Sequence, residues 1–118
     1  MNHILIDDEK EFCSLMTDFF TRKGYSVASS YNGKEGLAEF DSFKPDIVLL
    51  DIKMPVLGGI ETLEKIKENS NIPVIIVSGS ASKERQENCL ALGAYAFITK
   101  PISLDDIIDK VRSALESA

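Results

Sequence analysis

Five short apolar runs alternate with longer amphipathic stretches along the whole chain. The runs cover residues 3–6, 25–28, 47–50, 74–77 and 95–99. Three of them are apolar almost throughout rather than at every second residue, which is typical of parallel strands buried on both faces. The sequence therefore predicts a (βα)5 chain with right-handed crossovers. Such a chain forms an α/β fold whose parallel sheet is covered by helices on both faces.

The stretches between the runs carry apolar side chains at helical spacing. These side chains fall into five groups: Phe12, Leu15, Met16, Phe19 and Phe20; Leu37 and Phe40; Ile60, Leu63 and Ile66; Cys89, Leu90 and Leu92; and Leu104, Ile107, Ile108, Val111 and Leu115. Gly24 and Gly93 stand where helices are expected to end. Pro45 and Pro73 precede strands, and Ser103 is a candidate N-cap for the last helix.

Length and charge limit the kind of protein this chain can be. Its 118 residues suit a single domain over residues 1–118. A formal net charge of -6 argues against binding to nucleic acid or to an anionic membrane. The two cysteines, Cys13 and Cys89, lie in apolar helical contexts rather than in a disulfide framework. No apolar run approaches the roughly 20 residues that span a bilayer. We expect a cytoplasmic domain.

Polar side chains follow four of the predicted strands at their carboxyl ends. Asp7 and Asp8 follow the first strand, Asp51 the third, Ser78 the fourth and Lys100 the fifth. The carboxyl ends of parallel strands share one edge of an open sheet, and ligands bind at that edge. The pattern therefore predicts a site with three carboxylates, one hydroxyl and one ammonium.

Three neighbouring carboxylates repel one another unless a cation offsets their charge. Mg²⁺ prefers oxygen ligands and binds through carboxylates together with a phosphate. A carboxylate is also a known nucleophile in phosphoryl transfer, where a lysine and a hydroxyl can stabilise the transferred group. This composition favours phosphoryl chemistry.

Taken singly, each of these residues also has a purely structural interpretation. Asp7 and Asp8 could open a helix. Asp51 could form an Asx turn, and Ser78 could simply end a strand. Lys100 could lie in an ordinary loop before a helix. Their shared position at one edge of the sheet is what favours a site.

Four motifs in order give the chain a resemblance to a known family. They are IDDE at residues 6–9, LLDIKMP at residues 49–55 with Gly59 beyond it, VSG at residues 77–79 and TKP at residues 99–101. With them, the chain resembles the receiver domain of bacterial two-component response regulators over essentially its whole length. The resemblance implies a flavodoxin-like, doubly wound five-stranded sheet of order 2-1-3-4-5.

The resemblance also implies a metal site and a phosphoacceptor. Asp51 matches the aspartate that receives the phosphoryl group. Asp7, Asp8, Asp51 and the backbone carbonyl of Lys53 match the ligands of Mg²⁺ or Mn²⁺. Asp8 is expected to bind the ion directly and Asp7 through water.

Other matched residues would handle the phosphoryl group. Ser78 and Lys100 match the side chains that assist transfer, and together with Gly79 they would bind the transferred group. Ser78 and Phe97 match the pair that shifts when the domain switches. The Lys100–Pro101 peptide bond is expected to be cis.

The family further implies partners. A sensor histidine kinase or a histidine phosphotransfer protein would donate the phosphoryl group. The switch would then change the face formed by the fourth helix, fifth strand and fifth helix, which would act on a downstream output domain or protein or form a phosphorylation-dependent homodimer. Ala94, Tyr95 and Ala96 replace an acidic pair common in the family, which argues against the charged dimer of winged-helix regulators. The domain would be a signalling module rather than an enzyme.

Three other functions remain as alternatives. A phosphatase with an aspartate nucleophile places a second aspartate two residues after it, where this chain has Lys53. An interaction module that has lost phosphorylation is favoured by nothing in the sequence, since all the site residues are present, and absence of Mg²⁺ binding would indicate it. A flavin or dinucleotide site is disfavoured because no G-x-G-x-x-G motif follows a strand.

Overall fold

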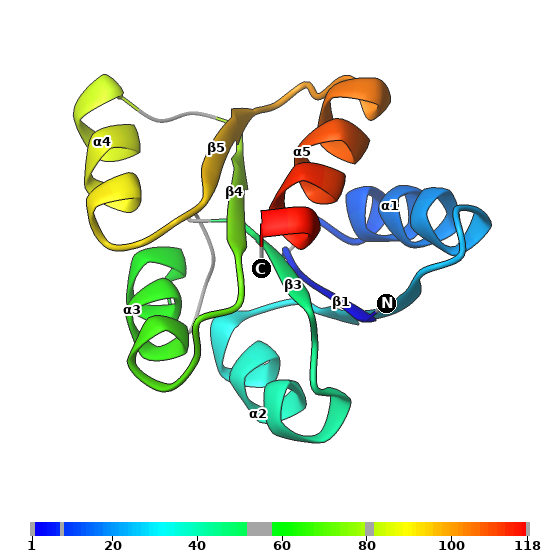
Figure 1. Cartoon of the computed structure of the whole chain (residues 1–118), viewed down its shortest axis with the longest axis horizontal. Coiled ribbons are helices and arrows are strands. Elements are labelled where there is room, and N and C mark those ends of the chain that lie inside the picture. The colour runs from blue at the N-terminus through cyan, green and yellow to red at the C-terminus, as the bar shows by residue number, and fades with distance from the viewer. Residues whose placement is uncertain (1, 8, 52–57, 80–81, 118) are drawn as a thin grey trace.

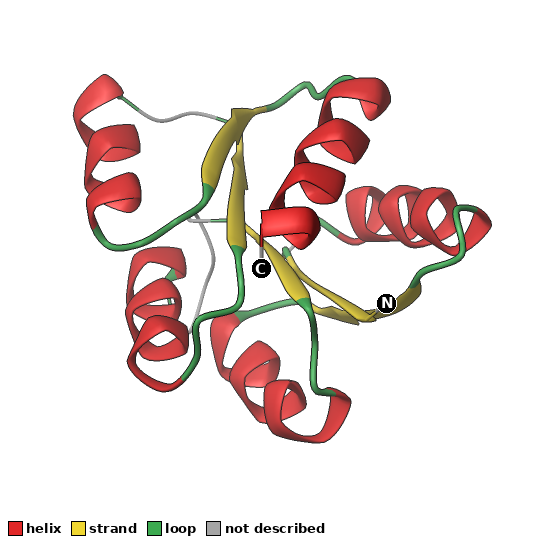
Figure 2. Cartoon of the chain, viewed as in Figure 1, coloured by secondary structure: helices red, strands yellow, loops and turns green. Residues whose placement is uncertain are grey.

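Strands and helices alternate along the chain in this computed structural model, which describes residues 2–7, 9–51, 58–79 and 82–117. Figure 1 shows a twisted sheet with helices on both sides, and Figure 2 colours the helices, strands and described loops separately. The elements are β1 (Asn2–Ile6), α1 (Lys10–Arg22), β2 (Ser26–Ser30), α2 (Gly33–Phe43), β3 (Ile47–Leu50), α3 (Gly59–Asn69), β4 (Val74–Ser78), α4 (Lys83–Ala91), β5 (Ala96–Thr99) and α5 (Leu104–Ser117). The predicted (βα)5 order is confirmed.

The strands of the described residues form one parallel sheet in the order β2-β1-β3-β4-β5. This is the expected flavodoxin-like order. Because the chain adds β2 on one side of β1 and β3 on the other, the direction of winding reverses between β1 and β3. Such a switch point leaves a crevice at the carboxyl ends of these two strands. Asp7 and Asp51 are the residues that follow them.

The sheet separates two apolar clusters. Successive side chains of a strand point to opposite faces, so β3 and β4 contribute to both clusters. Leu49, Ile75 and Val77 pack with α1 and α5, whereas Leu50 and Ile76 pack with α3 and α4. In Figure 1, α1 and α5 lie on one side of the sheet and α2, α3 and α4 on the other. All residues of β3 and β4 are buried, as their unbroken apolar runs predicted.

The helices bury narrower stripes than the sequence periodicity suggested. In α1 the buried residues are Cys13, Met16 and Phe20, while Leu15 is 55% exposed. Leu15 precedes Met16 by one residue, or about 100° around the helix, and therefore turns away from the sheet. Leu90 is exposed for the same reason beside buried Cys89.

Several local predictions are confirmed, and the strand bounds differ slightly. Gly24 and Gly93 follow α1 and α4 with φ of 94° and 107°. Ser103 accepts a hydrogen bond at its Oγ from the Asp106 N–H at 3.4 Å. The second strand begins at Ser26 rather than Tyr25, because the Tyr25 N–H donates to the Phe20 carbonyl and closes the turn after α1.

Two more findings concern the cysteines and the helices. Cys13 and Cys89 are both buried, and neither forms a disulfide. Across the described part of the chain, every helix is too short or too polar to cross a bilayer.

Candidate functional site

Two buried carboxylates lie at the carboxyl ends of the neighbouring central strands. Asp7 follows β1 and is 1% exposed, and Asp51 follows β3 and is 4% exposed. The Asp7 N–H donates to the Ser30 carbonyl at 3.0 Å, which continues the β1–β2 pairing. Asp7 Oδ1 then accepts the Glu9 N–H at 2.9 Å, which turns the chain into α1. Asp7 is therefore fixed by backbone contacts on both sides.

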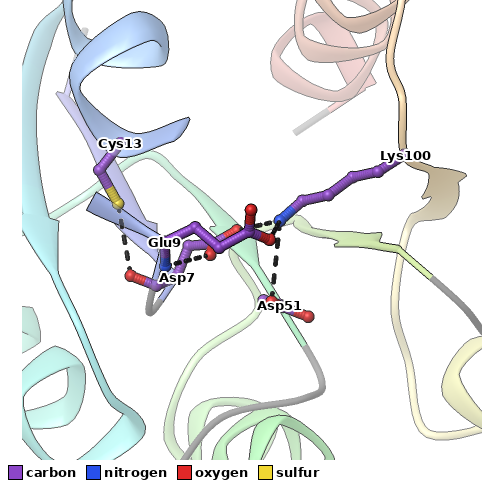
Figure 3. A network of polar contacts seen from close by, with 5 residues as sticks. All are labelled: Asp7, Glu9, Cys13, Asp51 and Lys100. Atoms are coloured by element: carbon purple, nitrogen blue, oxygen red, sulfur yellow. Dashed lines mark hydrogen bonds and ion pairs between the residues drawn. The ribbon is translucent and has the colours of Figure 1, made fainter. Parts of the chain in front are cut away.

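Lys100 reaches this crevice from the loop after β5. Its backbone N–H donates to the Ser78 carbonyl at 2.8 Å, and the Lys100–Pro101 bond is cis, as expected. Lys100 Nζ donates to Asp7 Oδ2 at 2.8 Å and to Glu9 Oε1 at 2.7 Å. It lies 3.8 Å from Asp51 Oδ2, and all four side chains converge in Figure 3.

The Lys100 ammonium also faces an aromatic ring. Nζ lies 4.2 Å from the centroid of Phe12, a distance at which a cation is attracted by the face of the ring. The Lys100 side chain is only 12% exposed. The ammonium is thus held by carboxylates and by the first turns of α1.

Burial and charge shift the pKa of both partners. Burial raises the pKa of Asp7, although the hydrogen bonds from Lys100 and from the Glu9 N–H oppose the rise. Burial on its own would lower the pKa of Lys100, but the hydrogen bonds to Asp7 and Glu9 and the charges of Asp7 and Asp51 outweigh it and raise the pKa. Lys100 is therefore cationic at neutral pH and offsets part of the negative charge of the site.

The carboxylates form a donor set that fits a hard divalent cation. Asp7, Glu9 and Asp51 each offer one oxygen, and the three oxygens lie within 4.8 Å of one another. Three carboxylates and one ammonium leave the group negatively charged, and oxygen donors are those that Mg²⁺ prefers. The other two predicted ligands, Asp8 and Lys53, lie outside the described residues.

The remaining predicted residues lie on β4 and β5. Ser78 ends β4, is fully buried and pairs with Thr99, while Gly79 after it is exposed. Phe97 pairs with Ile76 and packs in the same apolar cluster. Paired residues of neighbouring strands point to the same face, so Phe97 shares a face with Ile76. Ser78 lies two residues after Ile76 and therefore points to that face as well.

Sequence reasoning missed three contributors, Glu9, Phe12 and Cys13. The sequence indicates Glu9 only as part of the IDDE motif, and Phe12 and Cys13 only as residues of an apolar helical stretch. The Cys13 thiol donates to the Asp7 carbonyl at 3.4 Å. All three belong to the segment that opens α1 directly after Asp7. The sequence signal that could have identified them is their position shortly after the end of β1.

Comparisons with known proteins agree with this geometry. A family model described as the response regulator receiver domain matches residues 4–112. The chain is 40% identical over 109 residues to the protein-glutamate methylesterase/protein-glutamine glutaminase of Bacillus subtilis, which covers 86% of this chain and 30% of that protein. It is 32% identical over 116 residues to the transcriptional regulatory protein CpxR of Klebsiella pneumoniae, which covers 98% of this chain and 50% of that protein.

A solved structure gives the same result. A CheY-like response regulator receiver domain protein from Methanospirillum hungatei matches with a TM-score of 0.93 and 31% identity, covering 98% of this chain and 94% of that one. The chain therefore belongs to the response regulator receiver domain family. It is a receiver domain of two-component signalling, and it spans half or less of the length of the two curated relatives named above.

Proposed function

We propose that this chain is a single receiver domain over residues 1–118 that accepts a phosphoryl group on Asp51. The observation that carries the proposal is the position of Asp51. Its carboxylate is nearly buried at the switch point of the sheet, 3.8 Å from the Lys100 ammonium and grouped with Asp7 and Glu9. Membership of the receiver family supports the same role.

In the proposed reaction an Oδ atom of Asp51 attacks the phosphorus of a phosphohistidine on the donor protein. The new O–P bond forms as the P–N bond breaks, and the electron pair of that bond stays on the imidazole nitrogen. The product is an aspartyl phosphate. Lys100 and Ser78, together with the Gly79 backbone, would hold the oxygens of the transferred group.

The metal in this proposal is Mg²⁺, with Mn²⁺ as a substitute. The carboxylates of Asp7, Asp8 and Asp51 and the backbone carbonyl of Lys53 would hold it. Bound there, it offsets the charge that develops on the phosphoryl oxygens. The fit of the described donors to a hard cation supports this assignment.

The proposed output is a change in a protein-interaction surface. Ser78 and Phe97 share one face of adjacent strands, so a shift of the hydroxyl toward a phosphoryl group would let the ring move with it. That shift would bias the surface of α4, β5 and α5 toward binding a downstream domain or protein, or a second copy of the chain.

A sensor histidine kinase or a phosphotransfer protein would be the donor of the phosphoryl group. The domain serves signalling and is not proposed as an enzyme of independent substrate turnover, and no direct contact with nucleic acid or membrane is proposed.

The test is the intact mass of the protein after incubation with acetyl phosphate, with Mg²⁺ or with EDTA. We expect one added phosphoryl group in the wild type with Mg²⁺ and none with EDTA. Asp51→Asn is expected to abolish the addition and leave the circular dichroism spectrum unchanged. Asp41→Asn, which removes an exposed carboxylate from α2, is the matched control and should behave as the wild type. Uptake by Asp51→Asn at the wild-type rate would contradict the proposal.

Lys100→Ala separates uptake from response. We expect this variant to keep some phosphorylation because Asp51 remains, but to show weaker changes in the NMR spectrum of α4, β5 and α5. An unaltered spectral response would exclude Lys100 as the coupling group.

A further inference from the structure

Lys100 is hydrogen-bonded to the α1 side of the site and not to Asp51. Its ammonium donates to Asp7 at 2.8 Å and to Glu9 at 2.7 Å, whereas the 3.8 Å to Asp51 exceeds hydrogen-bond length. The Phe12 ring contacts the same ammonium from α1. Two of the three ammonium donors are therefore used on groups other than Asp51.

A phosphoryl group on Asp51 would compete with these acceptors for Lys100. To bond it closely, the ammonium would shift toward β3, and this shift would lengthen its present bonds to Asp7 and Glu9. Asp7 is 1% exposed and is fixed by the Glu9 N–H, so leaving it unpaired would be costly. The Glu9 carboxylate is 60% exposed and can be hydrated once Lys100 leaves it. Glu9 is thus the acceptor that Lys100 gives up most easily.

We propose that Glu9 is a positioning residue that holds Lys100 away from Asp51 before phosphorylation and so slows phosphoryl uptake. This inference rests on the proposed function. Glu9 reaches the ammonium because it stands at the N-cap position of α1, two residues after Asp7 and at the same sheet edge. Removing its charge would free Lys100 for the phosphoryl group without altering Asp51.

The first test is Glu9→Gln, which keeps the length of the side chain and removes its charge. With acetyl phosphate and a Mg²⁺ concentration that saturates each variant, we expect the rate of uptake on Asp51 to rise about two- to fivefold, the range expected for one partly exposed ion pair. Glu11→Gln removes a neighbouring exposed charge of α1 and is the matched control, expected to keep the wild-type rate. An unchanged or slower rate in Glu9→Gln overturns the inference.

A double-mutant cycle distinguishes the hold on Lys100 from a general charge effect. Acetyl phosphate is an anion, so loss of any nearby carboxylate could raise its local concentration. We expect Glu9→Gln to change nothing in a Lys100→Met background, because the group that Glu9 holds is then missing. The same gain in that background would show a field effect and overturn the inference.

A third measurement needs no phosphorylation. In EDTA, we expect the Lys100 ammonium protons to exchange with water faster in Glu9→Gln than in the wild type or in Glu11→Gln, as seen in nitrogen-15 NMR spectra. Equal rates of proton exchange in the wild type, Glu9→Gln and Glu11→Gln would contradict the proposed contact between Glu9 and Lys100. A wild type that takes up no phosphoryl group would instead refute the proposed function, so the two failures are distinguishable.

Discussion

At the scale of single residues, the site depends on one ammonium among several carboxylates. Lys100 forms ion pairs with Asp7, Glu9 and Asp51. Without its charge, repulsion among the three carboxylates would favour protonation of one of them or push the side chains apart. The pKa of Asp7 is nevertheless raised, because the effect of burial on this carboxyl exceeds the opposing effect of Lys100. The arrangement therefore favours any cation that enters the crevice.

Lys100→Met tests this balance through the free energy of unfolding in EDTA. We expect a loss of about 1–3 kcal/mol at neutral pH, because Asp7 then lacks its charged partner. The pKa of Lys100 is raised above 10.5 in the folded state, so its stabilising charge is fully present below pH 10.5 and is lost as the pH rises through the folded-state value. Urea titrations should show that the difference in free energy of unfolding between the wild type and Lys100→Met becomes smaller above pH 10.5.

The control for this experiment is Lys34→Met, which removes an exposed lysine of α2. The free energy of unfolding of Lys34→Met should differ little from that of the wild type at every pH. If the difference between Lys100→Met and the wild type stays constant through the alkaline range, the charge of Lys100 does not stabilise the fold.

At the scale of elements, strands were easier to predict than helix faces. The apolar runs of β3 and β4 are buried on both sides, and any apolar residue in them meets a helix. In α4 a single residue, Cys89, is buried, whereas Leu90 beside it and Leu92 just after the helix are exposed. Helical spacing identifies a possible face, but the packing angle of the helix decides how wide that face is.

Gly24→Ala and Gly93→Ala test the turns that end α1 and α4. Both glycines have positive φ, which costs an L-residue about 1–2 kcal/mol. We expect each variant to lose stability by that amount in urea titrations. A Cβ on Gly93 would also approach Lys67 Cε to 3.0 Å, so Gly93→Ala should cost at least as much as Gly24→Ala. Gly58→Ala is the control, since Gly58 has a φ of -66°, which suits an L-residue, and an added Cβ there meets no atom within 4 Å. A cost as large as at Gly24 would contradict the argument.

At the scale of the whole molecule, the site exists only when the sheet is complete. Asp7, Asp51 and Lys100 follow the first, third and fifth strands, and 93 residues separate the two ends of the Lys100–Asp7 bond. Each side chain is carried by a strand whose neighbours come from distant parts of the chain. Binding at the site is therefore linked to global stability.

Mg²⁺ is expected to raise the melting temperature of the wild type. A ligand at a hundred times its Kd stabilises the native state by about 2.7 kcal/mol, and the proposed donors converge only in that state. Circular dichroism melts in MgCl₂ and in EDTA should show the rise, and Asp51→Asn should reduce it. NaCl at equal ionic strength is the control. An equal rise in NaCl would mean that screening, and not binding, is responsible.

Much of this protein was determined by its sequence alone. The order of elements, the turn glycines and the placement of Asp7, Asp51, Ser78 and Lys100 at strand ends all follow from local periodicity and one rule of sheet topology. These features are local because side-chain period and chain reversal depend on neighbouring residues. Tertiary structure alone decided which acceptors hold Lys100. A long flexible side chain can reach several carboxylates, and only the folded positions of β1 and α1 place Glu9 and Asp7 within hydrogen-bond distance while leaving Asp51 beyond it.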